Sequence, residues 1–383
     1  MARFLTQEVI RSTTIQSKQD FCPFCDGRQI IKRGLRKNSH RHLQIYWCKD
    51  CLKYFSPLAG LKGVKYPPRV IVRALCLYNL GHSQEQTARR LASECRVTVP
   101  RRTLSDWISS YRPITAFHRL RSAAVCEFAQ GMLKERTLEH QQVYQYKVHL
   151  AKLAFAADAV APHVAEKVTR YLFSVFKDFP DALFQADGTA GIEPQDSLDK
   201  PVPHSSAAPV PATALRSSKS DFETLPVARI GKQNLANDLA ALGLLLARKN
   251  KDRHPSVQDF MLANDSCTIA CEVPVYLTAQ EIAYYKAEGF FVALPESAKP
   301  ITGHIDLVQA RNGFIHLLDY KPNARQIDPV NQLVVYALAL ASRTRLPVKA
   351  FKCAWFDELD YFEFFPLEAI KRKKIRNLVF NEC

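Results

Sequence analysis

The stretch that most constrains the fold runs from Gly303 to Tyr336 and carries two short runs of alternating apolar residues around Asn312-Gly313. Asn-Gly between alternating runs is the strongest short signal for a β-hairpin. With these two residues as the loop, Asp306 on one strand faces Asp319 on the other. Directly opposed side chains have Cβ atoms about 4.5–5.5 Å apart, where like charges destabilise the pairing. The fold therefore gains nothing from this pair unless a cation lies between the two carboxylates.

A lysine joins the two carboxylates. Lys321 lies two residues after Asp319, so both side chains point to the same side of their strand. In the predicted register Lys321 faces His304. Two carboxylates and a lysine on one patch are typical of a hydrolytic metal site rather than of a core. Gln332 and Tyr336 follow at i, i+4 spacing on a predicted helix, so both can reach the same spot.

This ordered set resembles the PD-(D/E)xK nuclease superfamily, in particular its RecB-like and CRISPR-adaptation branches. The residues that carry the resemblance are Gly303-His304-Ile305-Asp306, Asp319-Tyr320-Lys321 and the Q-xxx-Y pair Gln332 and Tyr336. The resemblance implies an α-β-β-β-α-β restriction-endonuclease-like core and a Mg²⁺- or Mn²⁺-dependent deoxyribonuclease. An endonuclease is favoured over an exonuclease, and the sequence leaves that choice open. Asp306 and Asp319 would bind the hard cation. Lys321 would orient the attacking water, and Gln332 and Tyr336 would border the substrate.

A third metal ligand, an upstream acid or histidine, completes such sites. Glu272, in a strand predicted over 267–277, is the first candidate, with a surface salt bridge as the alternative reading. His254 is the second candidate, and the sequence leaves the choice open. The CRISPR-adaptation branch often holds an iron–sulfur cluster with one upstream and three C-terminal cysteines. Only Cys353 and Cys383 follow the hairpin here, so no cluster is expected.

Positive charge is concentrated in the N-terminal part. Residues 1–150 contain 26 Lys and Arg against 10 Asp and Glu, whereas the remainder contains 27 of each kind. The net charge of +16 therefore resides entirely in the first 150 residues. Such asymmetry indicates a polyanion-binding module joined to a neutral domain, although a merely solvated basic surface would look similar.

Two C-x2-C motifs lie in this basic part, namely Cys22-Pro-Phe-Cys25 and Cys48-Lys-Asp-Cys51. Two such motifs at this spacing fit tetrahedral thiolate binding of a structural zinc ion, with free buried cysteines as the alternative. The predicted zinc ribbon covers residues 1–60. It is similar to ribbons at the N-termini of insertion-sequence transposases in its CPFC motif, its Lys32-Arg33-Gly34 turn and its aromatic segment YWCKDCLKYF.

Residues 61–125 have the layout of a helix-turn-helix. Three helices are predicted within 67–112, and Ser83 with Gln86 forms a capping-box pattern before the second. The unit resembles helix-turn-helix domains of transposases and resolvase-like proteins, with a plain helical bundle as the alternative. The predicted DNA-contacting residues are Arg89, Arg90, Arg101, Arg102 and Ser105, of which the arginines would mainly contact phosphates.

The remaining segments complete the domain prediction. Residues 126–184 are expected to be a helical connector, 185–222 a Pro/Ser/Ala-rich linker and 223–383 the nuclease domain. The linker would let the basic N-terminal part, which we call the reader (residues 1–125), move relative to the nuclease domain. The reader would raise the local concentration of DNA at the nuclease.

The predicted fold class is thus multidomain α/β, and the expected partner is DNA. A homodimer and a mobile-element protein are left open as further partners. Eleven cysteines and the absence of a secretory signal favour a reducing, cytoplasmic location, and no run is apolar enough for a membrane span. Two alternatives to a nuclease remain: a non-catalytic DNA-binding regulator, and a transposase component that cuts only with a partner.

Overall fold

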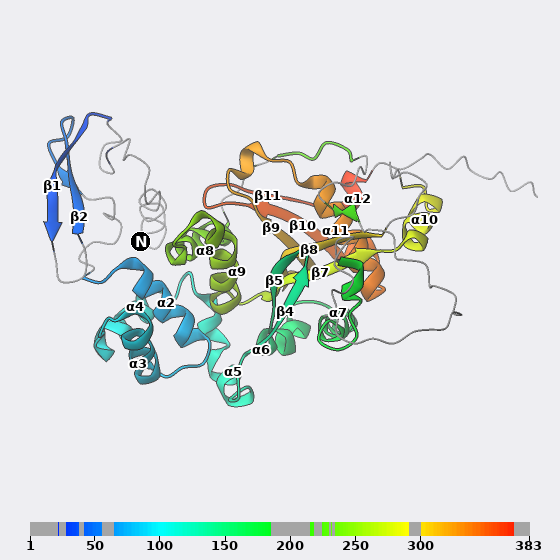
Figure 1. The fold of residues 1–383 in the computed structure, drawn as a ribbon, viewed down its shortest axis with the longest axis horizontal. Helices are drawn as coiled ribbons and strands as arrows, with labels where there is room; N and C mark the ends of the chain where they lie inside the picture. The colour runs from blue at the N-terminus through cyan, green and yellow to red at the C-terminus, as the bar shows by residue number, and fades with distance from the viewer. Residues whose placement is uncertain are drawn as a thin grey trace, which may run out of the picture.

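The computed structural model describes residues 22, 28–37, 42–55, 65–184, 215–217, 224–229, 231, 234–290 and 300–370. Within these residues the protein is mixed α/β, with a small three-stranded sheet near the N-terminus and a large mixed sheet flanked by helices (Figure 1). The strands of the small sheet are β1 (Ile30–Lys37), β2 (His42–Cys48) and β3 (Tyr54–Phe55). The strands of the large sheet are β4 (Leu133–His140), β5 (Gln142–His149), β6 (Leu215–Arg216), β7 (Thr268–Leu277), β8 (Ile301–Arg311), β9 (Phe314–Tyr320), β10 (Phe351–Phe356) and β11 (Tyr361–Phe364).

The described α-helices are α2 (Pro68–Asn79), α3 (Gln84–Cys95), α4 (Arg101–Tyr111), α5 (Arg121–Glu127), α6 (Leu150–Ala154), α7 (Pro162–Ser174), α8 (Leu235–Gly243), α9 (Arg253–Asn264), α10 (Ala279–Ala287), α11 (Val330–Thr344) and α12 (Pro366–Ala369). The large sheet has the order β11-β10-β9-β8-β7-β5-β4, and β6 pairs with β8 outside this path. Most neighbours are antiparallel. The exceptions are β9 with β10, which α11 connects, and β6 with β8.

The predicted hairpin is confirmed. Strands β8 and β9 pair with Arg311 opposite Phe314, so that Asn312 and Gly313 form the loop. Both loop residues have positive φ, 52° and 82°, as a type I′ turn requires. The order α9-β7-β8-β9-α11-β10 contains the expected α-β-β-β-α-β sequence, with α10 inserted between β7 and β8 and with β11 added at the edge.

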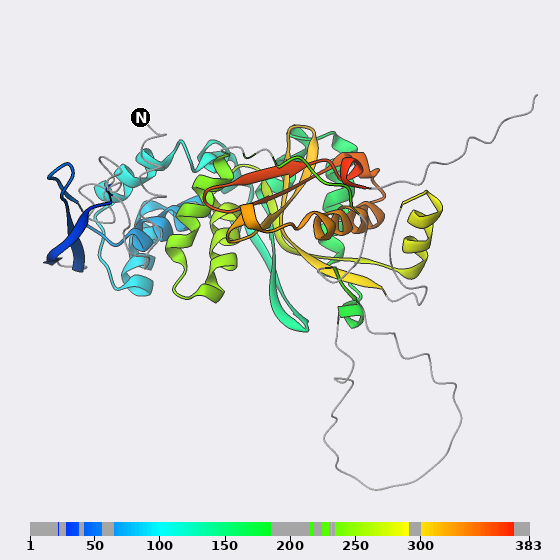
Figure 2. The same ribbon diagram turned by 90° about the horizontal axis from the view of Figure 1, so that it is seen from above.

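The prediction of a helical connector over residues 126–184 is wrong for its first half. Strands β4 and β5 form a hairpin that turns at Gln141, whose φ is 52°. Strand β5 joins the large sheet, because Lys147 and Val148 pair with β7. The hairpin extends beyond the rest of the sheet (Figure 2). The segment QVYQYKVH alternates as a strand does, and only the following part, through α6 and α7, is helical.

The three helices predicted over 67–112 are confirmed as α2, α3 and α4, and the Ser83–Gln86 capping box is present. Their expected separation from the C-terminal part is wrong. Asn79 of α2 donates a hydrogen bond of 2.8 Å to Asn264 of α9, and both side chains are buried. Val72 and Cys76 of α2 belong to the same apolar cluster as residues of α8 and α9. Residues 185–214 of the expected linker lie outside the described residues, and the chain re-enters as β6 of the large sheet.

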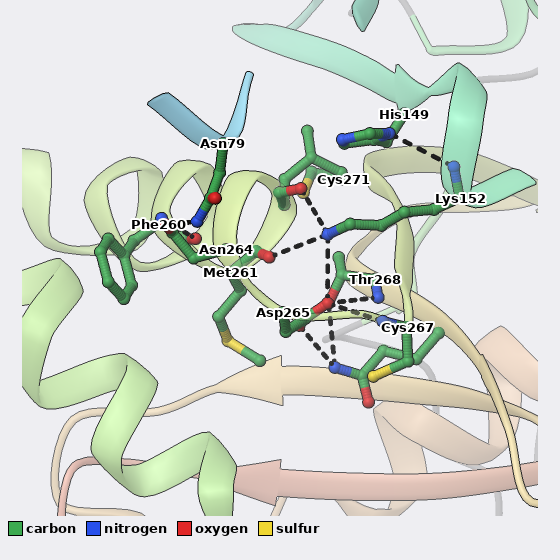
Figure 3. Close-up of polar contacts among 12 residues, drawn as sticks. Asn79, His149, Lys152, Phe260, Met261, Asn264, Asp265, Cys267, Thr268 and Cys271 are labelled. Carbon is green, nitrogen blue, oxygen red and sulfur yellow. Dashed lines mark hydrogen bonds and ion pairs between the residues drawn. The ribbon is translucent and has the colours of Figure 1, made fainter. Parts of the chain in front are cut away.

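A buried ion pair joins α6 to α9 and the sheet (Figure 3). Lys152 Nζ donates to Asp265 Oδ1 at 3.2 Å and to the carbonyl oxygen of Leu262 at 2.6 Å. The Asp265 carboxylate also accepts hydrogen bonds from the Thr268 backbone and from the Gln309 side chain. Because breaking such a pair leaves a buried charge uncompensated, this network fixes the C-terminal end of α9 to the start of β7.

Candidate active site

The hairpin brings the two predicted carboxylates together just beyond the paired part of β8 and β9, which ends at Leu307 opposite Leu318. The carboxyl groups of Asp306 and Asp319 are hydrogen-bonded to each other. Asp306 Oδ2 also accepts a hydrogen bond of 2.9 Å from the backbone of Tyr320. Asp319 is almost fully buried, with 2% of its surface exposed. Two acids thus share a site with little water to separate their charges.

The protonation of this pair follows from its surroundings. Burial and the charge of Asp306 raise the pKa of Asp319 well above its usual value, and Lys321 offsets only part of this. Burial would also raise the pKa of Asp306, but the hydrogen bond and charge of His254 and the charge of Lys321 hold that pKa below its usual value. The metal-free pair is therefore an ionised Asp306 that shares a proton with Asp319.

Lys321 is the nearest cation to the pair. Its Nζ lies 2.9 Å from Asp319 Oδ2. Burial would lower the pKa of its amine, but the charges of Asp319 and Asp306 raise that pKa above its usual value. Apart from this ion pair, the buried Oδ2 atom of Asp319 has no hydrogen-bond partner. A buried oxygen with unused acceptor capacity, beside a second carboxylate, fits a hard divalent cation.

Both candidates for the third ligand lie next to Asp306. His254, near the start of α9, places Nδ1 3.4 Å from Asp306 Oδ2. Glu272 on β7 accepts a hydrogen bond of 2.7 Å from Gln258 Nε2. Burial and the charge of Asp306 raise the pKa of Glu272 to about 8, so it is mostly protonated at neutral pH. Glu272 therefore forms a hydrogen bond to an uncharged amide and not the surface salt bridge considered as the alternative. Both Glu272 and His254 remain candidates for the third metal ligand.

The backbone at Glu272 has φ of 51°, a left-handed conformation in the middle of a strand. Such a conformation costs a side-chain-bearing residue on the order of 1–3 kcal/mol and is concentrated at functional sites. Gln258, which holds the Glu272 carboxyl, lies one helical turn after His254 on α9. This i, i+4 relation places both next to the carboxylates. Gln258 is a site residue that the sequence motifs did not predict.

The Q-xxx-Y pair forms part of the same site. Gln332 Nε2 donates to Tyr336 Oη at 2.7 Å, and burial with the charge of Asp319 raises the pKa of Tyr336 strongly. Ser217, directly after β6, hydrogen-bonds Tyr336. A Cβ atom at Gly303 would lie 2.6 Å from Ser217 Oγ and still closer to the Tyr336 ring. Glycine at 303 is thus required by the close approach of these two side chains.

A hydrogen-bonded chain reaches the strand that carries Asp306. His140, at the end of β4, bonds Asp181 Oδ1 through Nε2 at 2.8 Å and His304 Nε2 through Nδ1 at 2.9 Å. The His304 ring stacks on Tyr144, with centroids 3.7 Å apart. Burial lowers the pKa of His304 to about 3, so the ring is neutral. No local sequence pattern predicts this series of hydrogen bonds, because His140, Asp181 and His304 come from separate parts of the sequence.

The N-terminal cysteines also come together. The thiols of Cys22, Cys48 and Cys51 lie within 4.8 Å of one another and could hold a metal ion, whereas Cys25 lies outside the described residues. Within the described ranges this is the one group of three His, Cys, Asp or Glu ligand atoms at such distances. Around Asp306 the potential metal ligands among the described residues contact one another only two at a time, as His254 does with Asp306 and Asp306 does with Asp319.

The predicted DNA-contacting residues lie on the surface of the three-helix unit formed by α2, α3 and α4. Arg101, Arg102 and Ser105 are exposed along the first turns of α4. Arg89 and Arg90 are exposed on α3 and form i, i+4 ion pairs with acidic residues of the same helix, at 3.4 and 3.3 Å. Exposed pairs of this kind contribute little stability, so they leave the arginines free to exchange partners.

The chain matches no family model, no curated protein and no solved structure. Among the described residues, no helix combines the length and the apolar character that a membrane crossing needs.

Proposed function

We propose that the protein is a metal-dependent nuclease that hydrolyses phosphodiester bonds in DNA, targeted by its N-terminal zinc ribbon and helix-turn-helix. The observation that carries the proposal is the hydrogen-bonded pair of the mostly buried Asp306 and the almost fully buried Asp319, with Lys321 at its edge. Two adjacent buried carboxyl groups destabilise a core, whereas a hydrolytic metal site uses carboxylate oxygens as ligands for its cation.

The residues divide the work as follows. Asp306 and Asp319 would hold Mg²⁺ or Mn²⁺, with Glu272 or His254 as the third ligand. When bound, the metal would activate water and stabilise the negative charge that develops on the phosphate. Lys321 would orient the attacking water and offset phosphate charge. The Gln332–Tyr336 pair would border the substrate from α11.

The proposal is tested by cleavage of a closed-circular plasmid, which has no ends, with Mg²⁺ or Mn²⁺. Asp319→Ala and Lys321→Ala should each lower the rate about a hundredfold or more, because each removes several kcal/mol of transition-state stabilisation. Asp158→Ala, at an exposed aspartate outside the site, is the matched control and should cut as the wild type does. If the protein degrades only linear DNA, it is an exonuclease and not an endonuclease.

Two other functions would give different results. A DNA-binding regulator would leave the wild type and both variants equally inert while DNA binding persists. A transposase component would cut only after a partner protein is added, and inverted repeats would flank its gene. The intact set of Asp306, Asp319, Lys321, Gln332 and Tyr336 favours the nuclease over the regulator.

A further inference from the structure

The small sheet β1–β3 has two different faces. Cys48 of β2 is buried in the thiol cluster with Cys22 and Cys51. Side chains alternate along a strand, so Trp47, the preceding residue, points to the opposite face. This opposite face, which we call the outer face, lies away from the thiols. The small sheet itself lies at one end of the molecule, beside α2–α4 (Figure 1).

A row of one aliphatic and two aromatic residues crosses the outer face. Ile31 of β1 pairs with Trp47, and Trp47 pairs with Tyr54 of β3, so the three residues stand side by side across the strands. The rings of Trp47 and Tyr54 have centroids 6.4 Å apart. The Arg33 guanidinium lies 5.1 Å from the Trp47 centroid and is exposed. Tyr54 exposes 63% of its surface, one of the highest values among the large apolar residues.

The chemistry of the outer face selects its ligand. The exposed Tyr54 ring and the partly exposed Trp47 ring, with a cation beside them, suit the faces of unpaired bases, which stack on such rings, and a negatively charged backbone. Duplex DNA keeps its base faces stacked inside, so it offers such rings little to stack on. The excess of positive charge in residues 1–150 favours a nucleic acid over a neutral apolar protein partner.

We propose that the outer face of β1–β3 binds unpaired DNA, with bases stacked on Trp47 and Tyr54 and with Arg33 beside the backbone. This inference rests on the proposed function in taking DNA as the substrate. It adds a substrate class to that function, namely DNA in which a single-stranded segment adjoins the duplex held by the helix-turn-helix.

The test measures binding of the full chain, carrying Asp319→Ala to prevent cleavage, to fluorescein-labelled oligo(dT) and to a duplex of equal length. Tyr54→Ala and Trp47→Ala should each weaken oligo(dT) binding between about fivefold and a hundredfold, the range for loss of one stacked base. Duplex binding should change less than about twofold. The matched control is Tyr284→Ala on α10, because Tyr284 is similarly exposed, at 59%, and should bind as the parent does.

Intrinsic fluorescence supplies an independent reading. Trp355 is fully buried and Trp107 packs edge-on against Tyr66, so oligo(dT) should quench mainly Trp47. Trp47→Phe keeps a stacking ring and should retain most of the affinity while losing the quenching. Bound zinc equal to that of the parent shows that each variant has folded.

Three results would overturn the proposal: no binding of oligo(dT) by the parent protein, unchanged binding by folded Tyr54→Ala and Trp47→Ala, or equal losses on oligo(dT) and duplex. The last result would indicate a general backbone contact. Failure of the nuclease proposal is seen separately, as an inert wild type in the plasmid assay with oligo(dT) binding intact.

Discussion

Metal affinity should rise steeply with pH, because the carboxyl groups around Asp306 hold protons that a cation must displace. Burial and the charge of Asp306 raise the pKa of Glu272 to about 8 and that of Asp319 well above its usual value. Both groups are therefore protonated over a pH range in which ordinary carboxyl groups are ionised. Metal binding requires the ionised forms, so protons compete with the metal below these pKa values and the competition fades as the pH rises through them.

The size of the effect follows from the Glu272 carboxyl. With a pKa of about 8, about 1% of it is ionised at pH 6 and about half at pH 8. If Glu272 is a ligand, its proton alone makes the affinity about fiftyfold higher at pH 8 than at pH 6, or about 2.3 kcal/mol. The Asp319 proton adds up to about tenfold for each pH unit over which it remains bound.

The assay is a Mn²⁺ titration of zinc-loaded protein at pH 6, 7 and 8, in which electron paramagnetic resonance reports free Mn²⁺. Glu272→Gln should remove the Glu272 part of the pH dependence and weaken binding at pH 8. If His254 is the third ligand instead, Glu272→Gln keeps the full pH dependence and His254→Gln loses affinity. Asp158→Ala should behave as the wild type. An affinity that is equal at pH 6 and pH 8 would refute the assignment of protonated carboxyl groups to a metal site.

Three further predictions concern stability and the shape of the site. Lys152→Met should lower the free energy of unfolding by about 3–5 kcal/mol, because it leaves Asp265 buried without a counter-charge, and adding Asp265→Asn should recover part of the loss in urea denaturation. His316 is 2% exposed with no hydrogen-bond partner for either ring nitrogen, and burial lowers its pKa to about 3. The folded state thus binds fewer protons than the unfolded one below pH 6.5, and this histidine should cost about 3 kcal/mol at pH 4. His316→Leu should remove that part of the acid sensitivity; an unchanged difference between pH 7 and pH 4 would contradict it. Gly303→Ala should displace Tyr336 and slow plasmid cleavage while costing about 1–3 kcal/mol of stability; full activity would show that the close approach at 303 is not needed.

Local patterns predicted the centre of the fold well. The Asn312-Gly313 turn and the alternation on either side of it are properties of adjacent residues, and they gave the correct pairing of β8 with β9. The capping box at Ser83 is equally local and correctly marked the start of α3. The contact between Asp306 and Asp319 could be predicted because it follows directly from the register of this hairpin.

Contacts between distant segments could not be predicted from local sequence patterns. The β4–β5 hairpin is a strand pair because β7 offers it an edge, and the mixed apolar spacing after Tyr146 suits a helix as well as a strand. Ser217 reaches Tyr336 only because β6 pairs with the start of β8, where β9 has already ended. Its surrounding sequence, rich in proline and serine, gives no sign of a role in a site.

The attachment of α2 to α9 changes how the proposed nuclease would use its reader. Helix α9 carries His254 beside Asp306 near its first turn and Asn264 against Asn79 of α2 at its last. These two residues are ten positions apart, which corresponds to about 15 Å along the helix. One helix therefore joins the three-helix unit α2–α4 to the carboxylate pair, and the Lys152–Asp265 pair fixes its far end to the sheet. DNA held by α4 would then lie at a set distance from Asp306 and Asp319. A flexible tether raises local concentration but scatters the cuts, whereas this arrangement would place them at a fixed offset from the bound sequence.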